Sequence, residues 1–202
     1  NEIAEGFVFR TSDFCNTGTR IAFIIRSSIL YNLGYTDINP FRAYWLQDFF
    51  IEKVFELAPV RHEVFNRSSD SAIAPAAIIF YRYANGMNTD KNILEHITLK
   101  PSRFFSLFKI FSISRNDYKQ IQQNMLKQYD WLWKTLVYGS YLDFNFLNRL
   151  KETYPTIKEI IADKKKFVVG TGIQYSNNPL YNAKHLIGKP FISSRGIDSF
   201  LI

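Results

Sequence analysis

The sequence is poor in cysteine and histidine. Its one cysteine, Cys15, has no second cysteine with which to form an intrachain disulfide. The three histidines, His62, His96 and His185, are too far apart in the sequence to have the spacing of metal ligands. We therefore expect neither a metal site nor a domain held together by disulfides.

The chain also lacks an apolar run long enough to cross a bilayer or to act as a signal peptide. We therefore expect a cytoplasmic protein with no membrane partner. It begins with Asn1 instead of methionine and runs at once into an amphipathic pattern. We expect it to be a segment of a longer protein.

Hydrophobic residues, aromatic residues and positive charge are abundant. At 47% hydrophobic content, 202 residues can bury a substantial core. The net charge of +7, together with 19 Phe, 12 Tyr and 3 Trp, suits an anionic partner with flat rings, which describes nucleic acid. The alternative is a basic surface around an aromatic-rich core.

The first 83 residues have the pattern of an α/β sheet. Their apolar periodicity predicts a helix (3–14), a turn (16–20), a strand (20–26), a helix starting at Asn39 and Pro40, a strand (51–60), a polar link (61–72) and a strand (74–83). The first two strands are separated by a helix and should be parallel. The link before the third strand is too short for a crossover helix, so it predicts an antiparallel pair at one edge of the sheet.

Beyond Asn85 the sequence predicts a mixed segment with more helix. The expected elements are two strands (93–101 and 108–114), a long helix from Ser114 or Asn116 to Gly139, helices from Asp143 and from Pro155 to Ala162, and a strand-like stretch after Lys166. These patterns divide the chain into residues 1–85, a mixed connector over 86–166, and a third region over 167–202.

Several short motifs have ordinary interpretations. Ser27 and Ser28 follow a strand but lack the setting of a nucleophile elbow, so they are expected to be cap or turn residues. The glycines at 170 and 172 suit a tight turn or bulge better than a dinucleotide loop. The run Lys164, Lys165 and Lys166 either ends a helix in solvent or contacts phosphate groups of DNA.

One combination of segments is more specific. The order is RIAFIIRSSIL, a helix with Arg42, IEKVFELAPVRHEVF, a short polar link and APAAIIFYR. It resembles the second half of the catalytic domain of adenine-N6 DNA methyltransferases from restriction-modification systems. The resemblance covers roughly residues 3 to 83, with Arg26 standing where the family has proline. It implies the C-terminal half of a Rossmann-like methyltransferase sheet with an antiparallel edge hairpin, followed by a helical connector and a small mixed region.

The resemblance assigns a role to an aromatic residue in the polar link. Phe65 matches the family's residue that stacks on the adenine after the base has been flipped out of the duplex. Arg61 and Arg67, on either side of it, are then candidates for contacts to DNA. The alternative is that Phe65 is an ordinary core phenylalanine at a strand end.

The resemblance also implies what this chain does not contain. The family's glycine motif for S-adenosylmethionine and its Asn-Pro-Pro-type motif precede the matched part, and neither occurs here. Residues 130–202 more loosely resemble the linker and the start of a target-recognition region. We expect a methyltransferase fragment that is inactive alone, acting on double-stranded DNA with the N-terminal remainder of its parent chain. The alternative is a non-catalytic nucleic-acid-binding module.

Overall fold

The computed structural model describes residues 3–32, 39–65, 74–163 and Gly188. Contacts divide the chain into two units, residues 1–154 and residues 155–202. Within the described residues of the first unit, the strands are β1 (Arg20–Arg26), β2 (Phe49–Glu56), β3 (Ala76–Tyr83), β4 (Ile93–Thr98) and β5 (Tyr118–Gln122). The helices are α1 (Ile3–Arg10), α2 (Ser28–Tyr31), α3 (Pro40–Asp48), α4 (Arg61–Val64), α5 (Arg103–Phe108), α6 (Gln123–Gln128), α7 (Leu132–Tyr138) and α8 (Tyr141–Thr153), and the second unit contains α9 (Ile157–Asp163).

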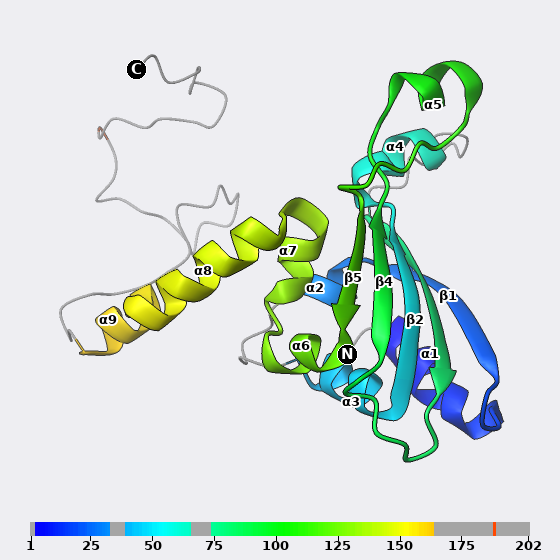
Figure 1. Ribbon diagram of the computed structural model, residues 1–202, viewed down its shortest axis with the longest axis horizontal. Helices are drawn as coiled ribbons and strands as arrows, with labels where there is room; N and C mark the ends of the chain where they lie inside the picture. Colours follow the sequence, from blue (N-terminus) through cyan, green and yellow to red (C-terminus); the bar gives the residue numbers. More distant parts are fainter. Residues whose placement is uncertain (1–2, 33–38, 66–73, 164–187, 189–202) are drawn as a thin grey trace. The chain divides into compact units, whose positions relative to one another are not determined.

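The strands form one mixed sheet in the order β1-β3-β2-β4-β5 (Figure 1). Strand β3 lies antiparallel between β1 and β2, β4 is parallel to β2, and β5 is antiparallel to β4. Strands β1, β2 and β4 therefore point the same way. This mixed α/β sheet is consistent with a partial Rossmann-like fold, as predicted. The antiparallel β2–β3 pair is confirmed, but it lies inside the sheet because β1 pairs with β3 and β4 pairs with β2.

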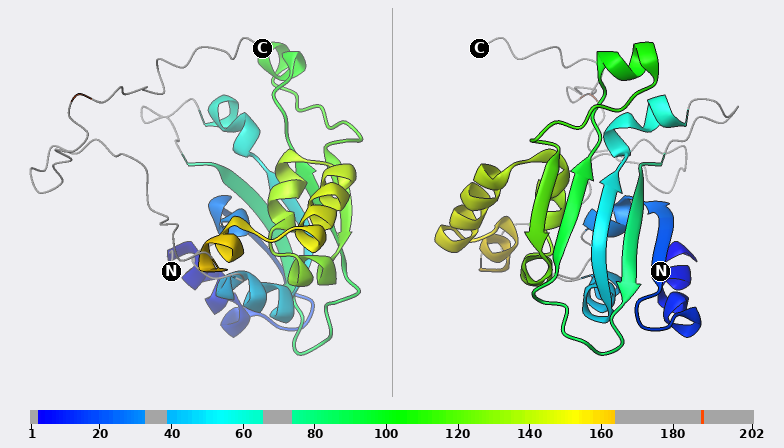
Figure 2. Two further views of the ribbon diagram at one scale, coloured as in Figure 1. Left: turned by 90° about the vertical axis from the view of Figure 1, so that its left-hand side faces the viewer. Right: turned by 45° about the vertical axis from the view of Figure 1, so that its right-hand side comes forward.

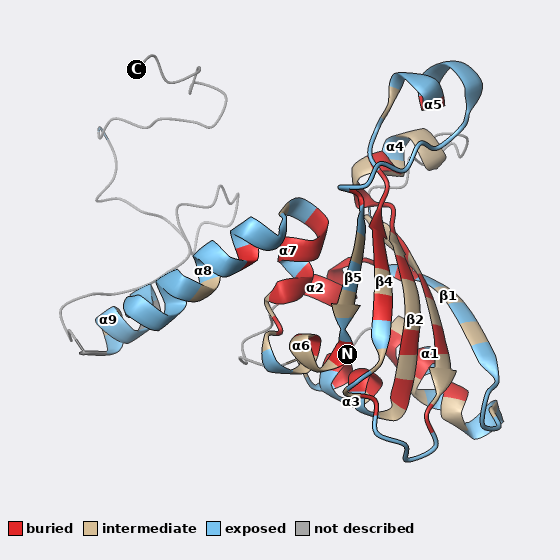
Figure 3. Cartoon of the chain, viewed as in Figure 1, coloured by how far each residue is buried: buried red, intermediate tan, exposed pale blue. Residues whose placement is uncertain are grey.

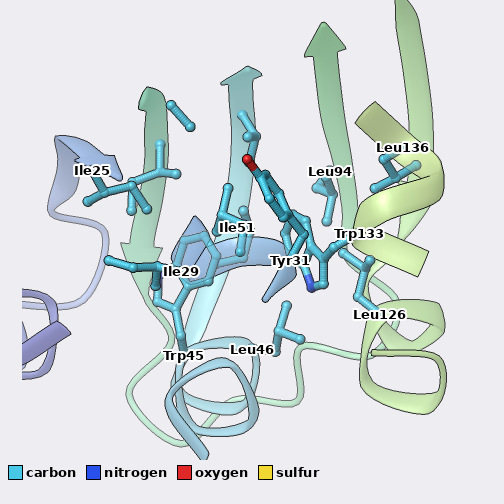
Figure 4. Packing of buried hydrophobic residues seen from close by; sticks show 14 of the residues in the cluster. Ile25, Ile29, Tyr31, Trp45, Leu46, Ile51, Leu94, Leu126, Trp133 and Leu136 are labelled. Carbon is cyan, nitrogen blue, oxygen red and sulfur yellow. The ribbon is translucent and has the colours of Figure 1, made fainter. Parts of the chain in front are cut away.

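Helices cover one face of the sheet and bury the main core (Figures 2 and 3). Asn39 caps α3 by accepting the N–H groups of Phe41 and Arg42, as its position before Pro40 predicts. The α3 side chain Trp45 then stacks on Trp133 of α7 with 6.2 Å between ring centroids, and both are fully buried. Figure 4 shows these two rings among apolar side chains of several strands and helices.

A buried ion pair joins two of these helical segments. Arg42 of α3 donates from Nε to Asp130 Oδ1 at 2.6 Å and also pairs with Asp130 Oδ2. Its Nη1 donates to the carbonyl oxygens of Ile29 and Asn32, at 2.8 and 3.0 Å. Every nitrogen of the guanidinium thus donates a hydrogen bond inside the protein, as a buried charge requires. Arg42 is a structural residue.

Two predicted elements after β4 are wrong. Residues 108–114 do not form a strand. Helix α5 ends at Phe108, Lys109 takes a left-handed conformation (φ 59°), and residues 110–114 pair with no strand. The long helix expected from Ser114 or Asn116 is replaced by β5, α6 and α7. Gly139 does end α7, as predicted.

The cause of the second error is a set of tertiary hydrogen bonds. Residues 118–122 pair with β4, and the buried side chain of Gln123 then donates to the carbonyl oxygens of Leu46 and Phe49. The Gln123 Oε1 accepts from the Ile51 N–H at 3.0 Å. These bonds fix residues 118–122 as a strand, although the spacing of their apolar residues also suits a helix.

Candidate functional site

The carboxyl ends of β1, β2 and β4 lie at the same end of the sheet, because these three strands point in one direction. Ligands of open α/β sheets bind outside the carboxyl ends of such strands. Helix α4 follows β2 at this end, and α5 follows β4 (Figure 1). The candidate site is therefore built from the segments that leave these strands.

A buried carboxylate connects two of the strand ends. Glu56, the last residue of β2, is fully buried, and its Oε1 accepts from Ser27 Oγ at 2.5 Å and from the Ala58 N–H at 2.8 Å. Burial raises the pKa of Glu56, and the hydrogen bonds from Ser27, Ala58 and Leu57 oppose this effect. The other oxygen, Oε2, has no hydrogen-bond partner among the described residues. Glu56 thereby fixes the turn that leads into α4.

Beside this turn is a pocket of about 350 Å³. Its charged lining residues are both cations: Arg61, the first residue of α4, and Lys100, which follows β4. Tyr31 and Tyr138 meet edge to face in its wall, with 6.4 Å between ring centroids. Burial, with a smaller contribution from the charge of Glu56, raises the pKa of the Tyr31 hydroxyl, so this group stays neutral. The pocket suits a polar or anionic group next to aromatic rings.

Phe65 lies immediately after α4, and its backbone N–H donates to the carbonyl oxygen of Arg61 at 3.0 Å. It is thus one helical turn from a residue that lines the pocket. The ring is half-buried and packs against a small apolar cluster at this end of the sheet, formed by Leu57, Val60, Ile97 and Leu99. Phe65 is neither a free loop residue nor a fully buried one. Base stacking by this ring stays a prediction.

Of the other predicted DNA contacts, only Arg61 falls in the described part of the chain. Arg67 and the run Lys164, Lys165 and Lys166 lie outside the described residues, as does His185. Three pocket residues were not predicted from the sequence: Tyr31, Lys100 and Tyr138. Lys100 lay inside the strand predicted over 93–101, so its sequence position gave no signal. The two tyrosines had none, because only the packing of α2 against α7 brings them together.

A second pocket, of about 400 Å³, lies among β5, α6, α7 and α8. Its wall is mainly apolar, and its one charged side chain, Lys119, donates to the carbonyl oxygen of Leu136. Burial lowers the pKa of Lys119. Because its one cation is already bound to a backbone carbonyl oxygen, this pocket has fewer polar groups for a ligand than the pocket beside α4.

Two other kinds of feature are absent from the part of the chain that the structure describes. The described residues contain no group of three or more His, Cys, Asp or Glu side chains that could hold a metal ion. Nor do they include a helix long and apolar enough to span a membrane.

The described glycines with positive φ lie away in the sequence from the strand ends at the candidate site. They are Gly18, Gly86 and Gly188, and none of them follows the carboxyl end of β1, β2 or β4. A glycine at such a strand end allows the backbone to approach the cofactor closely. The part of the chain that the structure describes therefore supplies no glycine turn for the cofactor.

Comparison with known proteins found similarity to solved structures but none to sequence families. No family model and no curated protein sequence matches the chain. A solved structure described as the structural basis of complex assembly and conformational transition of the type I R-M system contains a similar chain, with 15% sequence identity and a TM-score of 0.46. The similarity covers 81% of this chain and 36% of that chain, so the present chain spans about a third of its length.

Proposed function

We propose that this chain is the C-terminal half of the catalytic domain of an S-adenosylmethionine-dependent adenine-N6 DNA methyltransferase of a restriction-modification system, followed by a connector and the start of a target-recognition region. One observation carries the proposal. The segments that resemble this family fold into adjacent strands β1, β3 and β2, and the link from β2 to β3 carries Phe65 beside a cationic pocket at the carboxyl end of the sheet.

In the proposed role, the Phe65 ring stacks on the target adenine after it leaves the duplex. An enzyme that modifies the N6 amine must extrude the base, at a cost of a few kcal/mol. Stacking on an aromatic face stabilises the extruded base by roughly 1–3 kcal/mol. Because the ring is already held by Leu57, Val60, Ile97 and Leu99, little conformational freedom is lost when the base arrives.

Arg61 has a supporting role in this proposal. Its side chain lines the pocket, and its Nη1 lies 3.4 Å from the carbonyl oxygen of Ala58, which anchors the stem without using all the donors of the guanidinium. The remaining donors suit a phosphate oxygen of the target strand. Lys100 also lines this pocket, and its ammonium pairs with Asp117 at 2.9 Å.

The remaining parts of the reaction are assigned to the rest of the parent protein. S-adenosylmethionine supplies the electrophilic methyl group, and groups outside this chain would polarise the adenine amine. The present residues hold the flipped base and bind the DNA backbone. We accordingly propose that this chain alone binds no S-adenosylmethionine and transfers no methyl group.

The rival function, a non-catalytic module for single-stranded nucleic acid, needs a row of exposed aromatic side chains along one groove. Among the described residues of the first unit, the exposed aromatic side chains are instead spread over residues 7–14, residues 104–111, β5, and residues 138–154 of α7 and α8 and their ends. Many of the others pack in the core, where Trp45, Tyr81 and Trp133 are fully buried. This distribution favours the methyltransferase proposal.

The test is methyl transfer by the whole protein that contains this chain. Duplex DNA is incubated with the protein and S-adenosylmethionine, and the nucleosides are analysed by mass spectrometry. We expect N6-methyladenine and no methylated cytosine. In parallel, calorimetric titration of the 202-residue chain with S-adenosylmethionine should show no saturable binding at micromolar cofactor. Methylation of cytosine, or none at all, would contradict the proposed function.

A further inference from the structure

Residues 99–117 leave the sheet after β4 and return to it at β5; we refer to this segment as the α5 arm. Figures 1 and 2 show it extending beyond the end of the sheet where α4 lies. Its first residue, Leu99, belongs to the apolar cluster on which Phe65 packs, and the Leu99 N–H donates to the Glu56 carbonyl oxygen at 3.0 Å. The arm therefore starts from the proposed target-base site.

The arm exposes a group of large apolar side chains. Phe104, Leu107 and Phe108 of α5 are 62%, 74% and 63% exposed, and Ile110 is 61% exposed. Phe104 and Phe108 are one helical turn apart and their rings lie 6.2 Å from each other. Contiguous exposed apolar groups on a folded protein mark an interaction surface. These side chains are thus available to a partner.

The arm is nevertheless built as a defined structure. Phe105 turns inward and stacks on Phe111 with 4.3 Å between ring centroids, and Ser102 Oγ caps α5 by accepting from the Phe105 N–H. At its base, the Lys100 ammonium pairs with Asp117 at 2.9 Å. The Phe105–Phe111 contact and the Lys100–Asp117 ion pair therefore hold the arm in the conformation that exposes Phe104 and Phe108.

The exposed charge of the arm has one sign. Arg103, Lys109 and Arg115 are exposed, whereas Asp117, the only acidic residue from 99 to 117, is buried against Lys100 and Ser114. A surface of exposed cations around aromatic side chains is complementary to an anionic partner with apolar faces. DNA has both properties: apolar wedges of Phe, Leu or Ile enter its minor groove while basic side chains bind its phosphates.

We propose that the α5 arm is a second contact to duplex DNA beside the target base. Arg103, Lys109 and Arg115 bind phosphates, and Phe104, Leu107 and Phe108 enter the groove next to the base that Phe65 receives. The placement of the arm at the Phe65 end of the sheet favours this partner over a lipid surface. This inference rests on the proposed function, which supplies the duplex.

The charge contribution is tested by fluorescence anisotropy of a labelled duplex with the 202-residue chain over a series of salt concentrations. The triple variant Arg103→Ala, Lys109→Ala and Arg115→Ala should lower the slope of log affinity against log salt by about 3, since each phosphate contact contributes roughly 0.9. The matched control removes three exposed cations elsewhere, at Lys91, Lys134 and Arg149. An equal loss of slope in both triple variants would overturn the proposal.

The apolar contribution is tested with a triple variant that combines Phe104→Ser, Leu107→Ser and Phe108→Ser. It should weaken duplex binding about tenfold, equivalent to about 1.4 kcal/mol, without changing the slope of log affinity against log salt. The control is Tyr141→Ser, Leu142→Ser and Phe146→Ser on α8, whose side chains are also exposed. Unchanged DNA affinity would overturn the proposal, whether or not the variant loses binding to phosphatidylserine vesicles or loses self-association. Circular dichroism confirms that each variant is folded.

The two proposals can fail separately. If the arm variants behave as expected but the whole protein does not methylate adenine, the arm is a DNA contact and the proposed function is wrong. If the whole protein methylates adenine and the arm variants bind DNA normally, the proposed function stands and the arm proposal is wrong.

Discussion

Ser27 Oγ donates a 2.5 Å hydrogen bond to Glu56 Oε1, across 29 residues of sequence and between the ends of two strands that β3 separates. Both residues are fully buried. This contact sets where the chain turns after β2, and hence where α4 presents Arg61 and Phe65. Ser27 occupies the N-cap position of α2, as expected for a cap or turn residue. Its side chain makes no cap hydrogen bond and links two strand ends at the candidate site instead.

The first prediction concerns the ionisation of Glu56. Burial raises its pKa above the usual 4.5, so the folded state holds the proton more tightly than the unfolded state does. The contribution of this group to the free energy of unfolding is therefore greatest below pH 4.5 and declines as pH rises through the folded pKa. The Glu56→Gln variant lacks this titration, so its stability relative to wild type should increase with pH over that window in urea unfolding.

The matched control for this prediction is Glu56→Ala. It removes the acceptor of the Ser27 hydroxyl and the Ala58 N–H, which should lower the free energy of unfolding by about 1–3 kcal/mol. Because it also lacks the titration, its stability relative to wild type should show the same trend with pH as that of Glu56→Gln. A Glu56→Gln variant whose stability relative to wild type does not change with pH would show that folding does not raise the pKa of Glu56.

The second prediction concerns the ion pair between Arg42 and Asp130, which are 1% and 6% exposed at their side chains. Removing one partner leaves an uncompensated buried charge, so Arg42→Leu should cost roughly 3–5 kcal/mol of unfolding free energy. The double variant Arg42→Leu and Asp130→Leu should lose less unfolding free energy than the two single variants lose in sum. The partly exposed pair of Lys127 and Asp90 is the control, and Lys127→Gln should change the melting temperature little. Additive effects of the two leucine substitutions would contradict this account.

The third prediction concerns the buried His96. Burial lowers its pKa from 6.5 to about 3, with a smaller contribution from Lys119. Between these pH values the unfolded state binds a proton that the folded state does not, so the free energy of unfolding should fall as pH drops from 6.5 toward 3. His96→Leu should have a shallower acid dependence, while Thr98 keeps its bond to the Leu136 carbonyl oxygen. An acid dependence of His96→Leu as steep as that of wild type would contradict the assignment to His96.

The elements that the sequence predicted best carry local signals. The Asn39–Pro40 start of α3, the strand at 20–26 and the antiparallel pairing of the strands before and after the polar link were all expected, and all occur. Each depends on capping, on alternation or on the length of a connection, which are properties of adjacent residues. The strand order inside the sheet was not predictable in the same way, because β4 adds to β2 through a contact between distant segments.

The site was predicted only in part for the same reason. Phe65 and Arg61 were predicted as a stacking ring and a DNA-binding cation in the polar link, and the structure places Arg61 in the lining of a pocket. Tyr31 and Tyr138 reach this pocket from α2 and α7, and a single sequence without contacts cannot pair them. The arm after β4 was misread as a strand because its alternating apolar residues suit one, although those residues are exposed instead of paired.

The central claim is that the Phe65 ring stacks on a flipped adenine. Phe65→Ala in the whole protein should slow methylation by ~10- to 100-fold, since ~1–3 kcal/mol of stacking is lost and each 1.36 kcal/mol is a factor of ten. Because the ring is half-buried, this variant should also lose some stability. Phe65→Leu separates the two effects: it keeps much of the apolar packing but has no ring face. Phe65→Tyr and Phe65→Trp keep the face.

The decisive measurement is the single-turnover rate of adenine methylation per folded molecule, on matched duplexes and on duplexes with the target adenine mismatched. We predict that Phe65→Ala and Phe65→Leu are both slow on matched DNA, that mismatched DNA partly restores both because its base is easier to extrude, and that Phe65→Tyr and Phe65→Trp keep most of the rate. A normal rate for Phe65→Leu, with Phe65→Ala impaired only through a lower melting temperature, would show that Phe65 is a packing residue and would contradict the claim.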